Sequence, residues 1–337
     1  MNTKTYWRAA TVGLVCFLAQ ACGNDKGNGS PAEKPFNKIT FTFFAAVPLT
    51  HPDLTIYQLW AKPHAGTLTA QTAAWVSLGR FQLGIDSESG DTLMYTEDGS
   101  LIPNNTLSGL SVNLKDYDSL FITLEPAPSI DTFPTAPSAS VYLQGDIPVR
   151  EGNRIGALSS PFSQLQSVPD GLSRFVFDTP TDADPDNPLS GVWFVSVERR
   201  QGLYGLVTPP TGWIYEGWAL LGSGTPQVAV STGRFADPAH SDLDSSHSGS
   251  LPSYGYPGED FLHDPPPGAP PFPYTFVQGD NVAITVEPNP DPDPSHPFPL
   301  VIFTGGSDLV PGTTDFYRLD AHPEAVPAAQ ALFGQED

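Results

Sequence analysis

The chain has 337 residues, which is long enough for two domains that each bury a core of their own. Its formal net charge of −22 argues against nucleic acid and against electrostatic docking on anionic lipid, because both need a basic protein surface. Only 15% of the residues are charged, too few for a coiled coil, and 37 prolines with 31 glycines favour strands and loops over long helices.

The N-terminus has the organisation of a bacterial signal peptide, which we predict to span residues 1–21. Lys4 and Arg8 precede an apolar run that is too short for a comfortable membrane span. The run ends in Leu18-Ala19-Gln20-Ala21-Cys22-Gly23, which resembles the lipobox cleaved before a lipid-modified cysteine. Ala19 departs from the leucine usual at its position, so an ordinary signal peptide or a weak anchor helix is the alternative.

The cysteine content favours lipidation. The two cysteines are Cys16, inside the signal peptide, and Cys22, at the predicted cleavage point. An exported protein then has no disulfide partner for Cys22, which leaves lipidation as its use. Residues 22–37 form a flexible tether. The predicted location is the bacterial cell envelope, on a lipid anchor in the membrane. Outer membrane or cell surface is favoured, because Gly23 and Asn24, directly after Cys22, lack the aspartate that often retains a lipoprotein at the inner membrane.

Short apolar runs separated by turn residues predict six or seven strands within residues 38–147, with no helical period. The predicted strands are 39–44, 54–61, 75–83, 104–114, 120–126 and 138–143. This pattern is typical of an antiparallel β-sandwich.

Four blocks of this first domain recur in the same order, offset by roughly 160 residues, which indicates an internal duplication. The pairs are Tyr57-Gln58-Leu59-Trp60-Ala61 with Tyr215-Glu216-Gly217-Trp218-Ala219, Val76-Ser77-Leu78-Gly79-Arg80-Phe81 with Val230-Ser231-Thr232-Gly233-Arg234-Phe235, Leu120-Phe121-Ile122-Thr123-Leu124-Glu125-Pro126 with Val282-Ala283-Ile284-Thr285-Val286-Glu287-Pro288, and Val141-Tyr142-Leu143-Gln144-Gly145 with Val301-Ile302-Phe303-Thr304-Gly305.

The predicted fold is therefore all-β, with two tandem antiparallel β-sandwich domains related by duplication. The second domain spans residues 191–306 and differs from the first by a long insert at 236–276. Residues 148–190 form a linker that holds one further strand at 175–177. The C-terminal tail, 307–337, is predicted to hold one short helix at 325–333.

The repeated blocks resemble the extracytoplasmic C-terminal domain of anti-sigma-K-type factors. The first copy is similar through Leu124-Glu125-Pro126 followed by Pro134-Thr135-Ala136-Pro137, and the second through Gly212-Trp213-Ile214-Tyr215-Glu216-Gly217-Trp218 and Pro257-Gly258-Glu259-Asp260-Phe261. Secreted or lipid-anchored bacterial proteins carry this domain in a variant form. The chain lacks the cytoplasmic helical domain and the spanning helix of such factors, so the resemblance implies only the extracytoplasmic module and not sigma-factor binding.

These observations predict a non-catalytic envelope lipoprotein that binds, senses or scaffolds a protein or glycan, with no cofactor. A second hypothesis is a metal-dependent or carbohydrate-processing enzyme whose site lies in the 236–276 insert. There the histidines His240, His247 and His263 accompany Asp237, Asp242, Asp244 and Asp264. A third, accessory regulation of an envelope sigma-factor pathway, rests on the resemblance alone.

The motifs of known catalytic sites are missing. Gly-x-Ser-x-Gly and His-Glu-x-x-His do not occur, and cysteine clusters are absent, so neither a nucleophilic serine nor a zinc site is predicted. Asp291 and Asp293 alternate with prolines and are interpreted as an extended loop. The histidines are scattered through polar loops; they are His51, His64, His240, His247, His263, His296 and His322.

Two sets of residues are singled out. Arg80 with Glu125, and Arg234 with Glu287, occur in both repeats and are predicted to form equivalent structural contacts or strand-end caps. The insert is predicted to expose a recognition surface, with packing of the insert on itself as the alternative. That surface comprises Tyr254, Tyr256, Glu259, Asp260 and Phe261.

Overall fold

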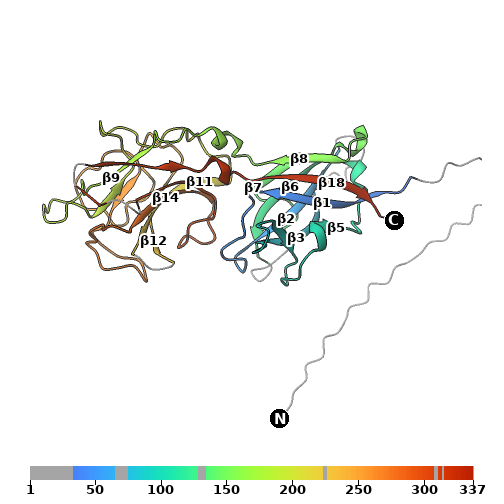
Figure 1. The fold of residues 1–337 in the computed structure, drawn as a ribbon, viewed down its shortest axis with the longest axis horizontal. Helices are drawn as coiled ribbons and strands as arrows, with labels where there is room; N and C mark the ends of the chain where they lie inside the picture. The colour runs from blue at the N-terminus through green and yellow to red at the C-terminus, as the bar shows by residue number, and fades with distance from the viewer. Residues whose placement is uncertain are drawn as a thin grey trace, which may run out of the picture. The chain divides into compact units, whose positions relative to one another are not determined.

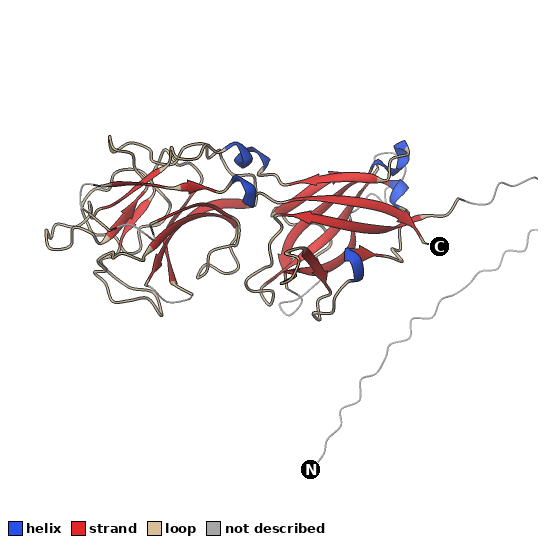
Figure 2. Ribbon diagram, viewed as in Figure 1, coloured by secondary structure: helices blue, strands red, loops and turns tan. Residues whose placement is uncertain are grey.

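The first part of the chain, together with one strand from its end, forms a nine-stranded antiparallel sheet that curls into a half-barrel (Figures 1 and 2). Its order is β4-β3-β2-β6-β7-β8-β18-β1-β5. We call this sheet with its connections the first lobe. Its strands are β1 (Phe36–Phe44), β2 (Thr55–Pro63), β3 (Val76–Ile85), β4 (Thr92–Tyr95), β5 (Thr106–Leu107), β6 (Tyr117–Pro126), β7 (Val141–Asp146), β8 (Ile155–Ser159) and β18 (Ala328–Gln335).

The remaining strands form two smaller antiparallel sheets, which we call the second lobe. One sheet has the order β13-β10-β9-β16 and the other β12-β11-β14-β15-β17. Their strands are β9 (Arg174–Phe177), β10 (Gly191–Trp193), β11 (Trp213–Leu221), β12 (Val228–Phe235), β13 (Gly258–Asp260), β14 (Asn281–Pro288), β15 (Val301–Gly305), β16 (Phe316–Arg318) and β17 (Asp320–Ala321).

Strand β18 brings the end of the chain back into the first lobe. It lies between β8 and β1 in the sheet, as the red strand between a green and a blue one in Figure 1. Its residues alternate strictly, since Ala329, Ala331 and Phe333 are buried while Gln330 and Leu332 are exposed. The helix predicted at 325–333 is therefore wrong. Alanine favours helices, but pairing on both sides with β1 and β8 outweighs that local preference.

The strand predicted at 104–114 is also corrected. Only β5 forms there, because Asn104 and Asn105 adopt φ angles of 53° and 51° and Gly109 one of 67°. Such left-handed residues end a strand. The linker 148–190 supplies one strand to each lobe, β8 and β9, and the second of these confirms the strand predicted at 175–177.

The core is apolar and rich in aromatic side chains. Tyr57 stacks on Phe81 in the first lobe at 5.7 Å between ring centroids, and Tyr215 packs on Phe235 in the second at 5.6 Å. One cluster of buried side chains runs through both lobes, and residues Pro35–Asp337 form one compact unit. The predicted all-β class is confirmed.

The computed structural model describes residues 33–64, 75–127, 134–222, 226–306, 310–312 and 315–336. The predicted signal peptide and Cys22 lie outside these residues. Across the described ranges, no helix has the length and apolar character needed to cross a membrane.

Candidate metal centre

Each lobe contains a buried polar corner at the end of a central strand. In the first lobe, the indole Nε1 of Trp60 on β2 donates to Thr123 Oγ1 on β6 at 2.9 Å. Thr123 donates in turn to Glu125 Oε1 at 2.5 Å, and the backbone N–H of Ser138 donates to the same oxygen at 2.8 Å. Glu125 is thus held by a hydroxyl and a backbone amide.

The second lobe repeats this corner on β11 and β14. Trp218 Nε1 donates to Thr285 Oγ1 at 2.9 Å, and Thr285 donates to Glu287 Oε1. The backbone N–H of Phe298 donates to the same oxygen at 2.9 Å. The strand orders also match, β3-β2-β6-β7 beside β12-β11-β14-β15.

The corners differ at the residue that stands opposite the threonine. In the first lobe this is Gln58, which pairs in register with Thr123 on one side and Arg80 on the other. Arg80 Nε donates to Gln58 Oε1 at 2.9 Å, and Gln58 Nε2 donates to Ser77 Oγ at 2.8 Å. The amide therefore has a partner for both its oxygen and its nitrogen.

In the second lobe the corresponding residue is Glu216, opposite Thr285 and Arg234. Ser231 Oγ donates to Glu216 Oε1 at 2.5 Å. Arg234, however, pairs through Nε with Asp244 Oδ2 at 3.2 Å and not with Glu216. The carboxylate is 3% exposed and its second oxygen has no hydrogen-bond partner.

Three carboxylates converge at this point, and we call Glu216, Glu287 and Asp291 the inner centre. One ligand oxygen from each lies within 4.8 Å of the others. Each residue also has one buried oxygen without a hydrogen-bond partner, namely Glu216 Oε2, Glu287 Oε2 and Asp291 Oδ2. Leaving a buried acceptor unpaired costs about 1–3 kcal/mol, and more for a charged group, so three together call for a counterion or protons.

Burial raises the pKa of all three carboxyls. The pKa of Glu216 rises to about 7 and that of Glu287 to about 8, in both cases chiefly by desolvation, and the pKa of Asp291 rises for the same reason. Glu216 and Asp291 add repulsion at Glu287. The inner centre therefore binds positive charge readily, whether as protons or as a cation.

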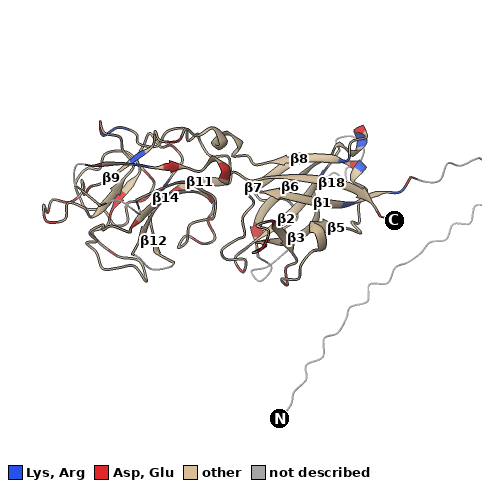
Figure 3. Cartoon of the chain, in the orientation of Figure 1, with Lys and Arg blue, Asp and Glu red and all other residues tan. Residues whose placement is uncertain are grey.

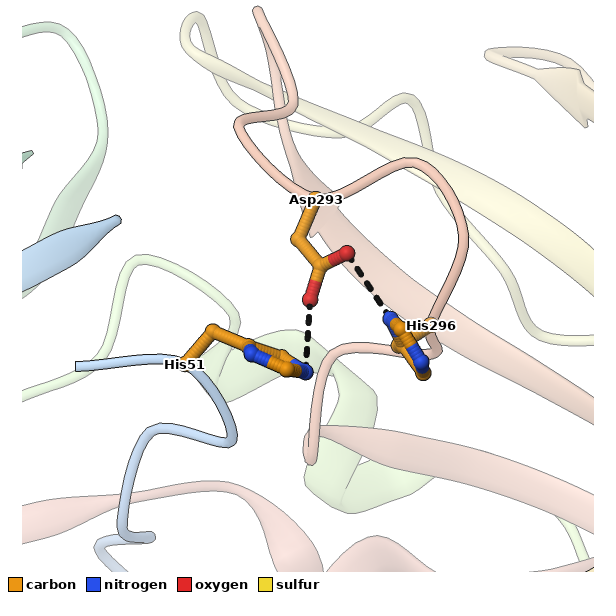
Figure 4. Close-up of side chains that lie close together, drawn as sticks. All are labelled: His51, Asp293 and His296. Carbon is orange, nitrogen blue, oxygen red and sulfur yellow. Dashed lines mark hydrogen bonds and ion pairs between the residues drawn. The ribbon is translucent and has the colours of Figure 1, made fainter. Parts of the chain in front are cut away.

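A second cluster lies on the same cavity, and we call His51, Asp293 and His296 the outer triad. Asp293 contacts both imidazole rings (Figure 4), with Oδ2 at 3.3 Å from His51 Nε2 and Oδ1 at 2.9 Å from His296 Nδ1, and the ring centroids lie 4.7 Å apart. The cavity has a volume of about 30 Å³ and is lined by Glu287 and Asp291 as well as by the triad. That volume holds an ion or a water but no organic ligand, whose pockets measure about 300–1,000 Å³.

The predicted Arg–Glu contacts do not form. Among the described residues, no ion pair joins Arg80 to Glu125 or Arg234 to Glu287, and the arginines contact Gln58 and Asp244 instead. The reason is strand order, because each arginine and its glutamate lie on strands that flank a third strand. The arginine pairs with a residue of that middle strand, which in turn pairs with the threonine two positions before the glutamate. Both glutamates are nevertheless buried at strand ends, where they accept hydrogen bonds.

The predicted recognition surface is mostly buried. Glu259, Asp260 and Phe261 are at most 1% exposed, so they cannot contact a partner. Tyr254 and Tyr256 are partly buried, and Tyr254 packs edge-on against a core tryptophan. The insert thus packs on its own lobe, because β13 pairs with β10 and gives its carboxylates backbone and hydroxyl partners.

The metal hypothesis for the insert is not favoured by geometry. Neither cluster that could hold a metal includes a residue of 236–276, all of which the structure describes. His240 pairs with Asp237 in its own turn, and His247 contacts the backbone oxygen of His263. Asp and Glu are scattered over both lobes (Figure 3), so the presence of acidic residues alone did not mark the site.

Sequence reasoning missed the residues of both clusters except Glu287. One signal was present, because the repeated blocks align Glu216 with Gln58, and a charged residue replacing an amide in a buried strand needs a partner. The outer triad had no such signal, since His51 and Asp293 are far apart in the sequence. Comparison of the chain with protein-family models, curated proteins and solved structures finds no match.

Proposed function

We propose that this protein is a non-catalytic, lipid-anchored binding protein of the bacterial cell envelope whose second lobe binds a calcium ion at the inner centre. One observation carries the proposal: two buried carboxylates and one half-buried carboxylate converge, and each keeps a buried oxygen without a hydrogen-bond partner. The envelope address is supported by the lipobox-like sequence before Cys22. Loss of membrane partitioning in Cys22→Ala, against the native protein, tests the anchor.

The ligand chemistry favours a hard cation. Carboxylate oxygens are the ligands that calcium and magnesium prefer, and calcium accepts them in flexible geometry at about 2.3–2.6 Å. Oxygens on opposite sides of such an ion lie about 5 Å apart, so three oxygens that lie within 4.8 Å of one another can contact one calcium ion. Magnesium demands near-ideal octahedral geometry and usually keeps several of its waters, so it is seldom held by protein carboxylates alone. Calcium is the better fit.

Binding is favoured over catalysis because two of the three carboxylates are closed to a substrate. Glu216 and Glu287 are 3% and 1% exposed. A cation there ties β11 and β14 to the loop that holds Asp291, and so stabilises the scaffold that presents the lobe's surface. The partner that this surface recognises is proposed to be an envelope protein or a glycan, and not nucleic acid, because the chain is strongly acidic.

The test is a calcium titration of the metal-free protein by calorimetry. A second readout is terbium luminescence excited through tryptophan, because Trp218 is linked to Glu287 through Thr285. We expect one calcium per chain, and a loss of affinity by at least about tenfold in Glu287→Gln, which removes a charged ligand. The matched control is Glu125→Gln, the same change in the first lobe, which should leave calcium binding unchanged.

Two results would overturn the proposal. One is a wild-type chain that takes up no calcium after removal of bound metal by a chelator. The other is equal calcium affinity in wild type and Glu287→Gln, with both variants folded by circular dichroism.

A further inference from the structure

We propose a second, independent metal site: the outer triad of His51, Asp293 and His296 binds a zinc ion that joins the first lobe to the second. His51 belongs to the loop between β1 and β2, whereas Asp293 and His296 belong to the loop between β14 and β15. The ligands thus come from two segments that are far apart in the sequence and meet only in the folded chain (Figure 4).

The spacing suits zinc. Zinc binds imidazole nitrogen and carboxylate oxygen at about 2.0–2.2 Å, so ligand atoms around a tetrahedral ion are separated by roughly 3.3–3.5 Å. The triad atoms lie within 4.8 Å of one another, with His51 Nε2 to Asp293 Oδ2 at 3.3 Å and His296 Nδ1 to Asp293 Oδ1 at 2.9 Å.

The chemistry of the ligands separates this site from the inner centre. Two imidazoles and one carboxylate suit zinc and similar late first-row ions, whereas calcium and magnesium prefer oxygen alone. His51, Asp293 and His296 have side chains exposed by 38%, 21% and 51%, so solvent reaches the ion position. Three protein ligands leave a fourth position that a water molecule fills.

The ligands are held in place before any metal arrives. The backbone oxygen of His51 accepts hydrogen bonds from the N–H groups of Leu54 and Thr55, which fixes its turn. On the other loop, Asp291 Oδ1 accepts from the N–H of Asp293 at 2.8 Å, and the N–H of His296 donates to the backbone oxygen of Asp293 at 3.2 Å. Preformed turns lower the ordering cost of binding.

A carboxylate also stands behind one of the histidines. His51 faces Asp293 with Nε2, and its other ring nitrogen, Nδ1, lies 3.9 Å from Asp53 Oδ1. Zinc-binding histidines usually present their second nitrogen to such a carboxylate or carbonyl, which fixes the ring and strengthens the ligand. At 3.9 Å this contact is an ion pair and not a hydrogen bond, so Asp53 orients the ring only through its charge.

The test uses the full chain saturated with calcium, to which zinc is added in a calorimeter and cobalt(II) in a spectrophotometer. We expect one zinc per chain, a tetrahedral cobalt spectrum, and a rise in melting temperature with zinc. His51→Ala and His296→Ala should each weaken zinc binding by more than the roughly 10- to 100-fold that loss of a second-shell partner costs.

The matched control is His240→Ala. His240 pairs with Asp237 three residues earlier, at 2.8 Å, as His296 pairs with Asp293, but no second histidine joins it. This variant should bind zinc like wild type. Zinc binding that is absent in wild type, or that survives in both His51→Ala and His296→Ala, would overturn the site.

Different variants test the calcium site and the zinc site, so either proposal can fail without the other. Glu216→Gln should impair calcium binding and leave zinc binding intact, and His51→Ala should do the reverse. Simultaneous loss of both ions in His51→Ala would show that the triad supports the inner centre and is no zinc site of its own.

Discussion

The polar corners of the two lobes share their hydrogen bonds and differ in charge. Both place a tryptophan, a threonine and a glutamate in one chain of contacts. The first lobe completes the corner with Gln58 and Arg80, which satisfy each other. The second lobe has Glu216 there, and its arginine contacts Asp244 outside the corner. One difference in charge thus separates a self-contained hydrogen-bond network from a centre that needs a counterion.

The two corners distinguish contacts that stabilise both lobes from groups that need a ligand. The shared Trp–Thr–Glu contacts hold neighbouring strands together and need no ligand. Among the described residues, buried carboxylate oxygens without a hydrogen-bond partner occur only in the second-lobe corner. An unpaired buried carboxylate destabilises the fold unless something binds it, so its presence points to a ligand and not to packing.

The lobes also differ because the end of the chain adds strand β18 to the first lobe. Substitution of Phe333 on this strand has the largest expected effect on stability. Phe333 on β18 is 1% exposed, while its neighbour Leu332 is 49% exposed. Phe333→Asp places a charge in the first-lobe core and should lower the free energy of unfolding by about 4 kcal/mol or more. Leu332→Asp should change it by about 0.5 kcal/mol.

Urea denaturation measures both variants. Similar losses of stability in the two would show that residues 328–335 do not form a strand with alternating faces. The result also tests whether the end of the chain belongs to the first lobe, a feature that the second lobe does not share.

The strands were predictable where local pattern and tertiary pairing agree. Thr55–Pro63 combines β-branched and aromatic residues between turn signals, Asn281–Pro288 is rich in β-branched residues, and both form central strands. Strand β18 was not predictable in this way, because its alanines favour a helix and only pairing with β1 and β8 decides otherwise. The candidate sites depend on loop closure between distant segments. His51 meets Asp293 through the fold, and no local pattern records that contact.

The second prediction makes the second-lobe corner resemble the first, through Glu216→Gln. In chelator above pH 8, removing one of three neighbouring negative charges should raise the free energy of unfolding by about 1 kcal/mol. In excess calcium the order should reverse, because wild type gains about 2.7 kcal/mol at a calcium concentration 100 times the dissociation constant and the variant gains little.

Thermal and urea unfolding with and without calcium provide the measurement. Gln58→Asn, a control that shortens the corresponding first-lobe side chain, should destabilise the protein equally in both conditions. An unchanged rank of wild type and Glu216→Gln in calcium and in chelator would contradict the assignment of the inner centre.

The smallest expected effect concerns the glycine that both lobes place at the bulge before the arginine. Gly79 and Gly233 have φ angles of 143° and 107°. A side chain at Gly79 would meet nothing within 4 Å, but at Gly233 it would lie 2.6 Å from Asp242 Cγ. The insert therefore covers the bulge in the second lobe only, and Asp242 is the residue that covers it, with Oδ2 accepting from the N–H of Gly258 at 2.8 Å.

Burial raises the pKa of Asp242 to about 8, with Glu259 and Asp244 adding repulsion. Between pH 4 and pH 8 the folded chain therefore binds more protons at this carboxyl than the unfolded chain. The contribution of Asp242 to the free energy of unfolding thus falls as the pH rises through that range. Asp242→Asn keeps an acceptor for Gly258 and removes the titration. We expect the variant to be about 1 kcal/mol more stable than wild type at pH 8.5 and nearly equal to it at pH 4. Urea denaturation across this range measures the difference. A difference in free energy of unfolding that stays constant with pH would mean that Asp242 is ionised throughout. The insert would then cover the bulge of the second lobe without burying a carboxyl whose pKa is raised.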